Sequence, residues 1–148
     1  MLLAAAFVTA PLPAFGVAVI TVTDPWVRVA PNGKSAEAFM VVMSSEGGSI
    51  VRADSDISTE VPLQRPGTQG TGIDAIPLPA GTNVKLAPGA YRLRLPKLNR
   101  TLKLGDRVAM SLVVEAPDGS RQAIPVNAEV RRRSAYDDHL LPHKHSHK

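Results

Sequence analysis

Short apolar runs, broken by proline and glycine, follow one another along most of the chain. Residues 19–30 (VITVTDPWVRVA) are rich in β-branched side chains and nearly alternate between apolar and polar positions, which is typical of a β-strand. Asp24 and Pro25 interrupt this pattern, and because proline cannot donate to a ladder we expect a sheet edge or a bulge there. Residues 38–43 (AFMVVM) form an unbroken apolar run, which predicts a central strand buried on both faces.

Turn signals separate the remaining apolar runs, for example Ala87-Pro88-Gly89 and Pro117-Asp118-Gly119-Ser120. No segment has a convincing helical period. Strands spaced by about 8–12 residues, with turns between them, predict an all-β sandwich. We expect a loop at residues 65–76 and an edge position at Pro125. The further strands are expected at residues 50–56, 59–64, 84–86, 91–95, 107–116 and 123–130.

The sequence YRLRL alternates cleanly between large apolar residues and arginines. Because side chains on a strand alternate between faces, we expect Tyr91, Leu93 and Leu95 on one face and Arg92 and Arg94 on the other. Two interpretations of the arginine pair stay open. The pair is either a solvated strand face or a binding surface for an anion or an acidic partner, which the guanidinium fork suits.

A chain of 148 residues is long enough for one hydrophobic core. Residues 1–17 are apolar and end in small residues, which predicts an export signal and a periplasmic location, although no cation follows the initiator methionine and a structural strand is the alternative. The run is too short and too proline-broken for a stable membrane span. The predicted division is a signal peptide at 1–17, a β-sandwich domain at 18–130 and a basic, His-rich tail at 131–148, which we expect to be disordered when unliganded.

The net charge of +4 is concentrated near the end of the chain. Five Lys/Arg and two Asp follow Val130, a net +3, so the preceding body is nearly neutral. Six aromatic residues form no stripe interleaved with basic residues, and we expect no nucleic-acid partner. The body also lacks the His and Cys needed for a Ser-His or Cys-His nucleophile pair, so we expect no enzyme activity.

Soft-metal ligands are distributed unevenly, since the chain has no cysteine and all its histidines lie in the last ten residues. Before them the chain offers only methionines, and Met40, Met43 and Met110 lie in apolar strands where core packing is expected, as it is for Trp26. Imidazoles at alternate positions suit Cu(II) better than Cu(I), and also Zn(II) or Ni(II). A solvated tail or the remnant of a tag is the alternative. The candidate metal ligands are His139, His143, His145 and His147.

Several landmarks occur in an ordered series: ITVTDPWVRVAP, AEAFMVV, LPAG, LAPGAYRLRL and LKLGDRVAMSLVVE. In this order they resemble the periplasmic copper A chaperone (PCuAC) family over roughly residues 18–127. The resemblance implies an exported, cupredoxin-like (Ig-like) β-sandwich. It also implies copper as cargo, with delivery to the copper centre of cytochrome c oxidase.

The copper ligands of that family do not carry over to this chain. The resemblance places the first histidine at Gln64, an isolated methionine within residues 67–76, which contain none, and a His-x-Met pair at Arg92 and Arg94. Guanidinium has no lone pair to donate and is always charged. We therefore expect a copper site that has degenerated on the sandwich.

Two functions follow from these observations. The first is a copper carrier that loads Cu(II) on its histidine tail and passes it to a cytochrome c oxidase copper-centre subunit or another copper carrier. The second is an exported interaction module that keeps the fold and has lost metal chemistry, with Arg92 and Arg94 as a basic patch. The tail favours the first function, whereas a body without histidine favours the second.

Overall fold

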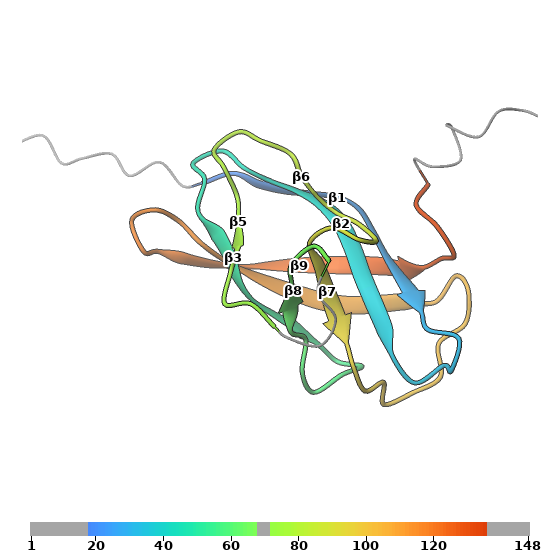
Figure 1. Cartoon of the computed structure of the whole chain (residues 1–148). Helices are drawn as coiled ribbons and strands as arrows, with labels where there is room; N and C mark the ends of the chain where they lie inside the picture. The colour runs from blue at the N-terminus through green and yellow to red at the C-terminus, as the bar shows by residue number, and fades with distance from the viewer. Residues whose placement is uncertain (1–17, 68–71, 136–148) are drawn as a thin grey trace, which may run out of the picture.

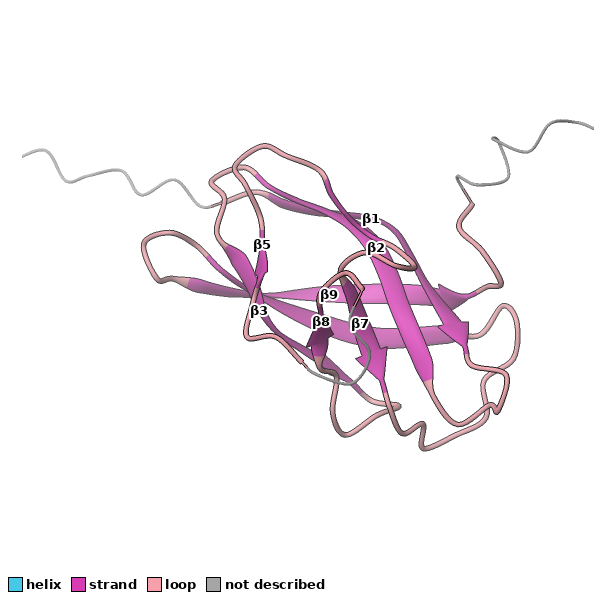
Figure 2. Cartoon of the chain, in the orientation of Figure 1, coloured by secondary structure: helices cyan, strands magenta, loops and turns pink. Residues whose placement is uncertain are grey.

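The computed structural model describes residues 18–67 and 72–135, and this part of the chain consists of strands and loops without a helix (Figure 2). The all-β class predicted from the pattern is confirmed. No helix in the described residues has the length and apolar character needed to cross a membrane. The strands are β1 (Ile20–Val29), β2 (Ala36–Ser44), β3 (Ser49–Ser55), β4 (Leu63–Gln64), β5 (Ile76–Pro77), β6 (Val84–Leu86), β7 (Arg92–Leu95), β8 (Arg107–Glu115) and β9 (Arg121–Val130).

The strands form one continuous sheet that folds over itself into two layers (Figure 1). Its order is β4-β7-β2-β1-β9-β8-β3-β5, and β6 also pairs with β2. The layers join where β1 runs parallel to β9, with Trp26 opposite Glu129 and Val27 opposite Val130. The other strand pairs are antiparallel. The predicted sandwich is therefore confirmed, as a nearly closed barrel.

The core lies between the two layers. It consists of the side chains that point inward, at alternate positions along each strand. Met40 and Met110 are buried there, as predicted, beside Ile50, Leu93 and Leu112, whereas Met43 is only half-buried and lies outside this core. Burying each such side chain stabilises the fold by about 1.5–3 kcal/mol. This burial fixes the register of every core strand, because a slip of one residue would turn the apolar face to water.

Trp26 is buried, but it packs outside the main core. Its ring lies 4.6 Å from that of its cross-strand neighbour Phe39, with the planes tilted by 42°. The guanidinium of Arg28 lies 5.3 Å from the centre of the Phe39 ring, a cation–π geometry. The middle of β2 is thus buried on both faces, through Phe39 and Met40, whereas Val41 is only half-buried.

The two prolines that interrupt predicted strands lie in different structural settings. The Asp24-Pro25 break is a bulge, since the register with β2 shifts between Thr23 and Trp26 and Asp24 has a φ of 50°. Pro125 lies opposite Ser111 of β8, and β9 meets β1 only farther along, so the predicted edge position is confirmed.

Residues 59–64 form less strand than predicted. Strand β4 contains only Leu63 and Gln64, because Pro62 accepts a hydrogen bond from the Arg94 N–H but has no N–H to return, and because β7 is short. The predicted loop at residues 65–76 contains a bridge from Ile73 back to Leu63, and Ile76 begins β5.

The first residues after β9 remain attached to β1. The N–H of Arg131 donates to the carbonyl of Val27 at 2.9 Å. The Arg131 side chain donates to Asp24 Oδ1 at 2.5 Å, and Ser134 Oγ donates to Asp24 Oδ2 at 2.8 Å. The expected export signal at 1–17 and the predicted metal ligands His139, His143, His145 and His147 lie outside the described residues.

Candidate functional site

A hollow of about 540 Å³ lies at the end of the sandwich where β1, β2, β4 and β7 adjoin. This volume falls within the roughly 300–1,000 Å³ typical of small-molecule sites. Ionisable and amide side chains share its wall with small residues. Its lining comprises Arg28, Val29, Ala30, Pro31, Ser35, Ala36, Glu37, Gln64, Arg92 and Arg94.

Strand register brings the polar side chains of the hollow together. Arg28 of β1 lies opposite Glu37 of β2, which in turn lies opposite Arg94 of β7. These three residues therefore form a row across neighbouring strands. Arg92, two residues before Arg94 and on the same face, lies opposite Gln64 of β4. The hollow thus contains the positions at which the resemblance to PCuAC places a histidine and the His-x-Met pair.

Glu37 is the centre of the charge arrangement. Its Oε2 lies 3.4 Å from Arg28 Nη2, and its Oε1 lies 3.4 Å from Arg92 Nε. Arg92 Nη1 also donates to the carbonyls of Arg65 and Ala90, at 3.3 Å each. A buried cation is tolerated only when it is paired and hydrogen-bonded, and Arg92 meets both conditions.

The interpretation of Arg92 and Arg94 as a solvated strand face is wrong for Arg92. The side chain of Arg92 is only 8% exposed, whereas that of its partner Glu37 is 32% exposed. The physical reason is the carboxylate on the next strand, which supplies the counter-charge that burial of a guanidinium requires. Arg94 is half-buried and lines the same hollow.

Two polar groups in the hollow have unused hydrogen-bonding capacity. Gln64 is 2% exposed, and its carboxamide makes no hydrogen bond within the described part of the chain. The guanidinium of Arg94 likewise makes no hydrogen bond or ion pair among the described residues. Both groups line the hollow, where a ligand would be able to reach them.

The donor set of the hollow does not fit copper. Copper prefers imidazole, thiolate and thioether, and the hollow instead offers guanidinium, carboxamide and one carboxylate that is already paired. Nowhere in the described residues do three or more His, Cys, Asp or Glu side chains gather in a way that could hold a metal ion. Chemically, these groups are hydrogen-bond donors for an oxyanion.

A second charged cluster lies at the junction of β1 and β9. Arg131 Nε lies 3.3 Å from Glu129 Oε1, and Arg107 Nη2 lies 3.2 Å from Glu129 Oε2. The hydrogen bond from Arg131 lowers the pKa of Glu129 and raises the pKa of Arg131 itself, with Asp24 adding to the latter. A smaller hollow of about 360 Å³ is lined by Arg131 and by Arg28, and so adjoins the first hollow. We regard the charged cluster as structural, because its charges satisfy one another.

Sequence reasoning identified Gln64, Arg92 and Arg94 but not Arg28 and Glu37. The sequence does contain a signal for the pairing of Arg28 with Glu37. The turn at Pro31-Asn32-Gly33 lies midway between them, and an antiparallel hairpin places residues at equal distances from its turn opposite each other.

The fold is similar to that of solved PCuAC domains. The apo PCuAC domain from PmoF1 superimposes with a TM-score of 0.65 at 18% identity, covering 77% of this chain and 94% of that domain. For the copper-bound PCuAC domain from PmoF2, the TM-score is 0.60 at 23% identity, with 76% and 93% covered. For CuI-DR1885 from Deinococcus radiodurans, it is 0.53 at 26% identity, with 79% and 78% covered.

Comparison with curated proteins gives no match. Residues 20–130, from the start of β1 to the end of β9, match the LpqE-like family of lipoproteins. The match spans the whole sandwich, including the hollow. Together with the solved PCuAC structures, it confirms the resemblance seen in the sequence. The chain therefore belongs to the LpqE-like family and has the cupredoxin-like β-sandwich of PCuAC domains.

Proposed function

We propose that this copper-chaperone-like protein is exported to the periplasm and that its sandwich serves as a metal-free, non-enzymatic binding module. The observation that carries the proposal is the environment of Arg92, a buried guanidinium paired with Glu37 where the family's histidine would lie. A cation held there by a carboxylate and two carbonyls opposes the approach of a second cation. Substitution of the ligands and the added positive charge both act against copper binding.

The histidine tail supports a second candidate function, that of a copper carrier. His139, His143, His145 and His147 are the only histidines of the chain, and neutral imidazole is a good ligand for Cu(II). In this role the tail would capture copper and release it by ligand exchange to a copper-centre subunit of cytochrome c oxidase or to another copper carrier. The sandwich would then position the tail without touching the metal.

A calorimetric titration of the full chain with Cu(II), and with Cu(I) under reducing conditions, tests both functions. It is repeated on a variant in which the four tail histidines are alanine. We expect this variant to bind neither ion, because every strong ligand has been removed from the tail and the hollow offers none. A variant with Lys144 and Lys148 replaced by alanine is the matched control, since it alters the tail charge and keeps the imidazoles.

Stoichiometric copper binding by the variant without histidines would overturn the metal-free module, because the metal would then have to bind to the sandwich. Absence of copper binding by the unaltered chain would remove the carrier function and leave the module. Copper binding that depends on the histidines would support both functions together.

A further inference from the structure

We propose that the hollow is a binding site for a small oxyanion, a carboxylate or a phosphate, held by Arg94, Gln64 and Arg92. This inference rests on the proposed role of the sandwich as a metal-free binding module and specifies the ligand class of that module. The hollow combines excess positive charge, unused hydrogen-bond donors and adequate volume.

The charges of the hollow do not balance. Arg28, Arg92 and Arg94 contribute three positive charges and Glu37 one negative charge, which leaves a net charge of +2. Glu37 is shared between Arg28 and Arg92, whereas Arg94 has no acidic partner among the described residues. A concave site lined by one sign of charge concentrates counter-ions, so the hollow attracts an anion carrying up to two charges.

Gln64 provides the second observation. The residue is 2% exposed and makes no hydrogen bond within the described part of the chain, so its carboxamide keeps only slight contact with water. An oxyanion in the hollow would accept hydrogen bonds from the Gln64 amide and from the Arg94 guanidinium. Ligand binding would therefore satisfy a group that the protein itself leaves without a partner.

The third observation is that the arginine deepest in the site is already fixed. Glu37 and the carbonyls of Ala90 and Arg65 orient Arg92 before any ligand arrives. Binding then costs little rotamer entropy at that residue, and its fixed positive charge attracts the carboxylate or phosphate to which Arg94 and Gln64 would donate hydrogen bonds. The volume of about 540 Å³ leaves room for a small organic acid or inorganic phosphate.

The test is a calorimetric titration of the full chain at low ionic strength, with succinate in one arm and inorganic phosphate in the other. We expect at least one of the two to bind. Binding of succinate alone assigns the site to carboxylates, and binding of phosphate alone assigns it to phosphates. Binding of neither overturns the proposal.

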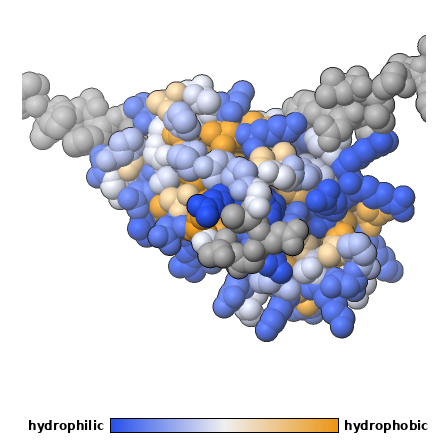
Figure 3. Space-filling view, in the orientation of Figure 1, coloured by the Kyte–Doolittle hydropathy of each residue, from blue (hydrophilic) through white to orange (hydrophobic). Residues whose placement is uncertain are grey.

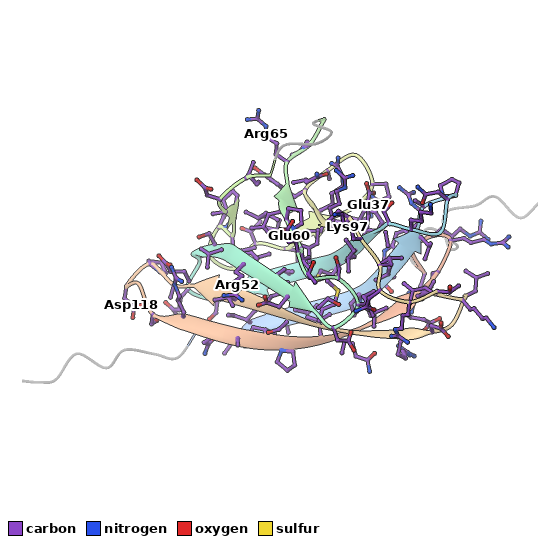
Figure 4. The ribbon with its side chains drawn as sticks, turned by 90° about the horizontal axis from the view of Figure 1, so that it is seen from below. Glu37, Arg52, Glu60, Arg65, Lys97 and Asp118 are labelled. Atoms are coloured by element: carbon purple, nitrogen blue, oxygen red, sulfur yellow. The ribbon has the colours of Figure 1, made fainter. Side chains whose placement is uncertain are left out.

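Arg94→Gln is the decisive variant, because Arg94 makes no side-chain bond on which the fold depends. Loss of a charge-assisted hydrogen bond should weaken binding by about tenfold or more. The matched control is Arg52→Gln, the same change on β3, in the other layer and far from Glu37 (Figure 4). Equal effects of the two substitutions would reduce the site to a general charge effect and overturn the proposal.

Gln64→Leu separates binding from folding. Leucine has nearly the same size and leaves no amide without a partner, so the variant should unfold at an equal or higher denaturant concentration while binding the anion more weakly. An unchanged anion affinity would remove Gln64 from the site and contradict the proposal. The copper titration described above does not depend on these results, so failure of the anion site and failure of the metal-free module are distinguishable.

Discussion

Arg92 Nε lies 3.4 Å from Glu37 Oε1, in the wall of a hollow shared by β1, β2, β4 and β7. The pair joins β7 to β2 across a diagonal of the sheet, since the direct partner of Glu37 on β7 is Arg94. Its guanidinium is shielded from water, whereas its carboxylate is one-third exposed. The pair is therefore both a structural contact and the charged wall of the candidate site.

The energetic coupling of this pair can be measured directly. Arg92→Gln should lower the free energy of unfolding by about 1–3 kcal/mol, because a hydrogen-bonded charged group is lost and the carbonyls of Ala90 and Arg65 each lose a donor. Urea unfolding of Glu37→Gln, Arg92→Gln and the double variant would give a coupling energy of about 0.5–3 kcal/mol. Strictly additive effects would contradict the direct interaction.

Restoring the family's ligand types should restore copper binding to the sandwich. Replacement of Gln64 and Arg92 by histidine and of Arg94 by methionine creates two imidazoles and a thioether around the same hollow and removes two positive charges. In a background without tail histidines, we expect this triple variant to bind Cu(I) in a competition assay with a chromogenic chelator. The background protein is the control. Equal behaviour of the two proteins would contradict the placement of the copper positions in this hollow.

Gly48 cannot be replaced without moving the backbone. It has a φ of 110°, and a Cβ at this position would lie 2.0 Å from the carbonyl oxygen of Glu115 on β8. Gly48→Ala should therefore destabilise the fold by roughly 3 kcal/mol or more. Gly119→Ala is the matched control, because its φ is 86° with nothing within 4 Å, and it should cost only about 1 kcal/mol. Similar melting temperatures for the two variants would contradict the steric explanation.

Acid should weaken the cluster at Glu129. Hydrogen bonding and attraction from Arg131 hold the pKa of Glu129 below its ordinary value, which is about 4.3. The folded state then binds fewer protons than the unfolded chain, so stabilisation is fully present above this pH and is lost as pH falls through the lowered pKa. Hydrogen bonds from Ser120 likewise lower the pKa of Asp118, so its contribution to stability also falls as the pH falls.

Urea unfolding between about pH 7 and about pH 3 would measure this dependence. The Glu129→Gln variant should be less stable than the unaltered protein at neutral pH and should lose less stability as the pH falls. If both proteins showed the same dependence on pH, Glu129 would not be a source of the acid sensitivity.

The strand pattern could be predicted from the sequence because apolar alternation and turn residues are local signals. The strands predicted at residues 19–30 and 107–116 nearly coincide with β1 and β8 for this reason. The burial of Arg92 could not be predicted in the same way, because it depends on Glu37, more than fifty residues earlier in the chain. The anchoring of Arg131 to Asp24 is equally non-local, and without its partner the arginine cannot be distinguished from those that follow it.

The face seen in Figure 3 is largely hydrophilic, and its hydrophobic side chains form separate small patches. Monomeric proteins rarely expose large apolar patches, and interaction sites often do. On this face, recognition by the sandwich would therefore depend on charge and hydrogen bonding rather than on apolar area.

The attachment of Arg131 and Ser134 to Asp24 has a further consequence for the histidine tail. It fixes the point at which the chain leaves the sandwich, and Arg131 shares a hollow with Arg28, which also lines the candidate anion site. His147 follows Ser134 by thirteen residues, a tether of roughly 45 Å at full extension. A metal ion held at His147 would thus lie within about that distance of Ser134. The contacts of Asp24 therefore fix the origin from which the reach of the tail is measured.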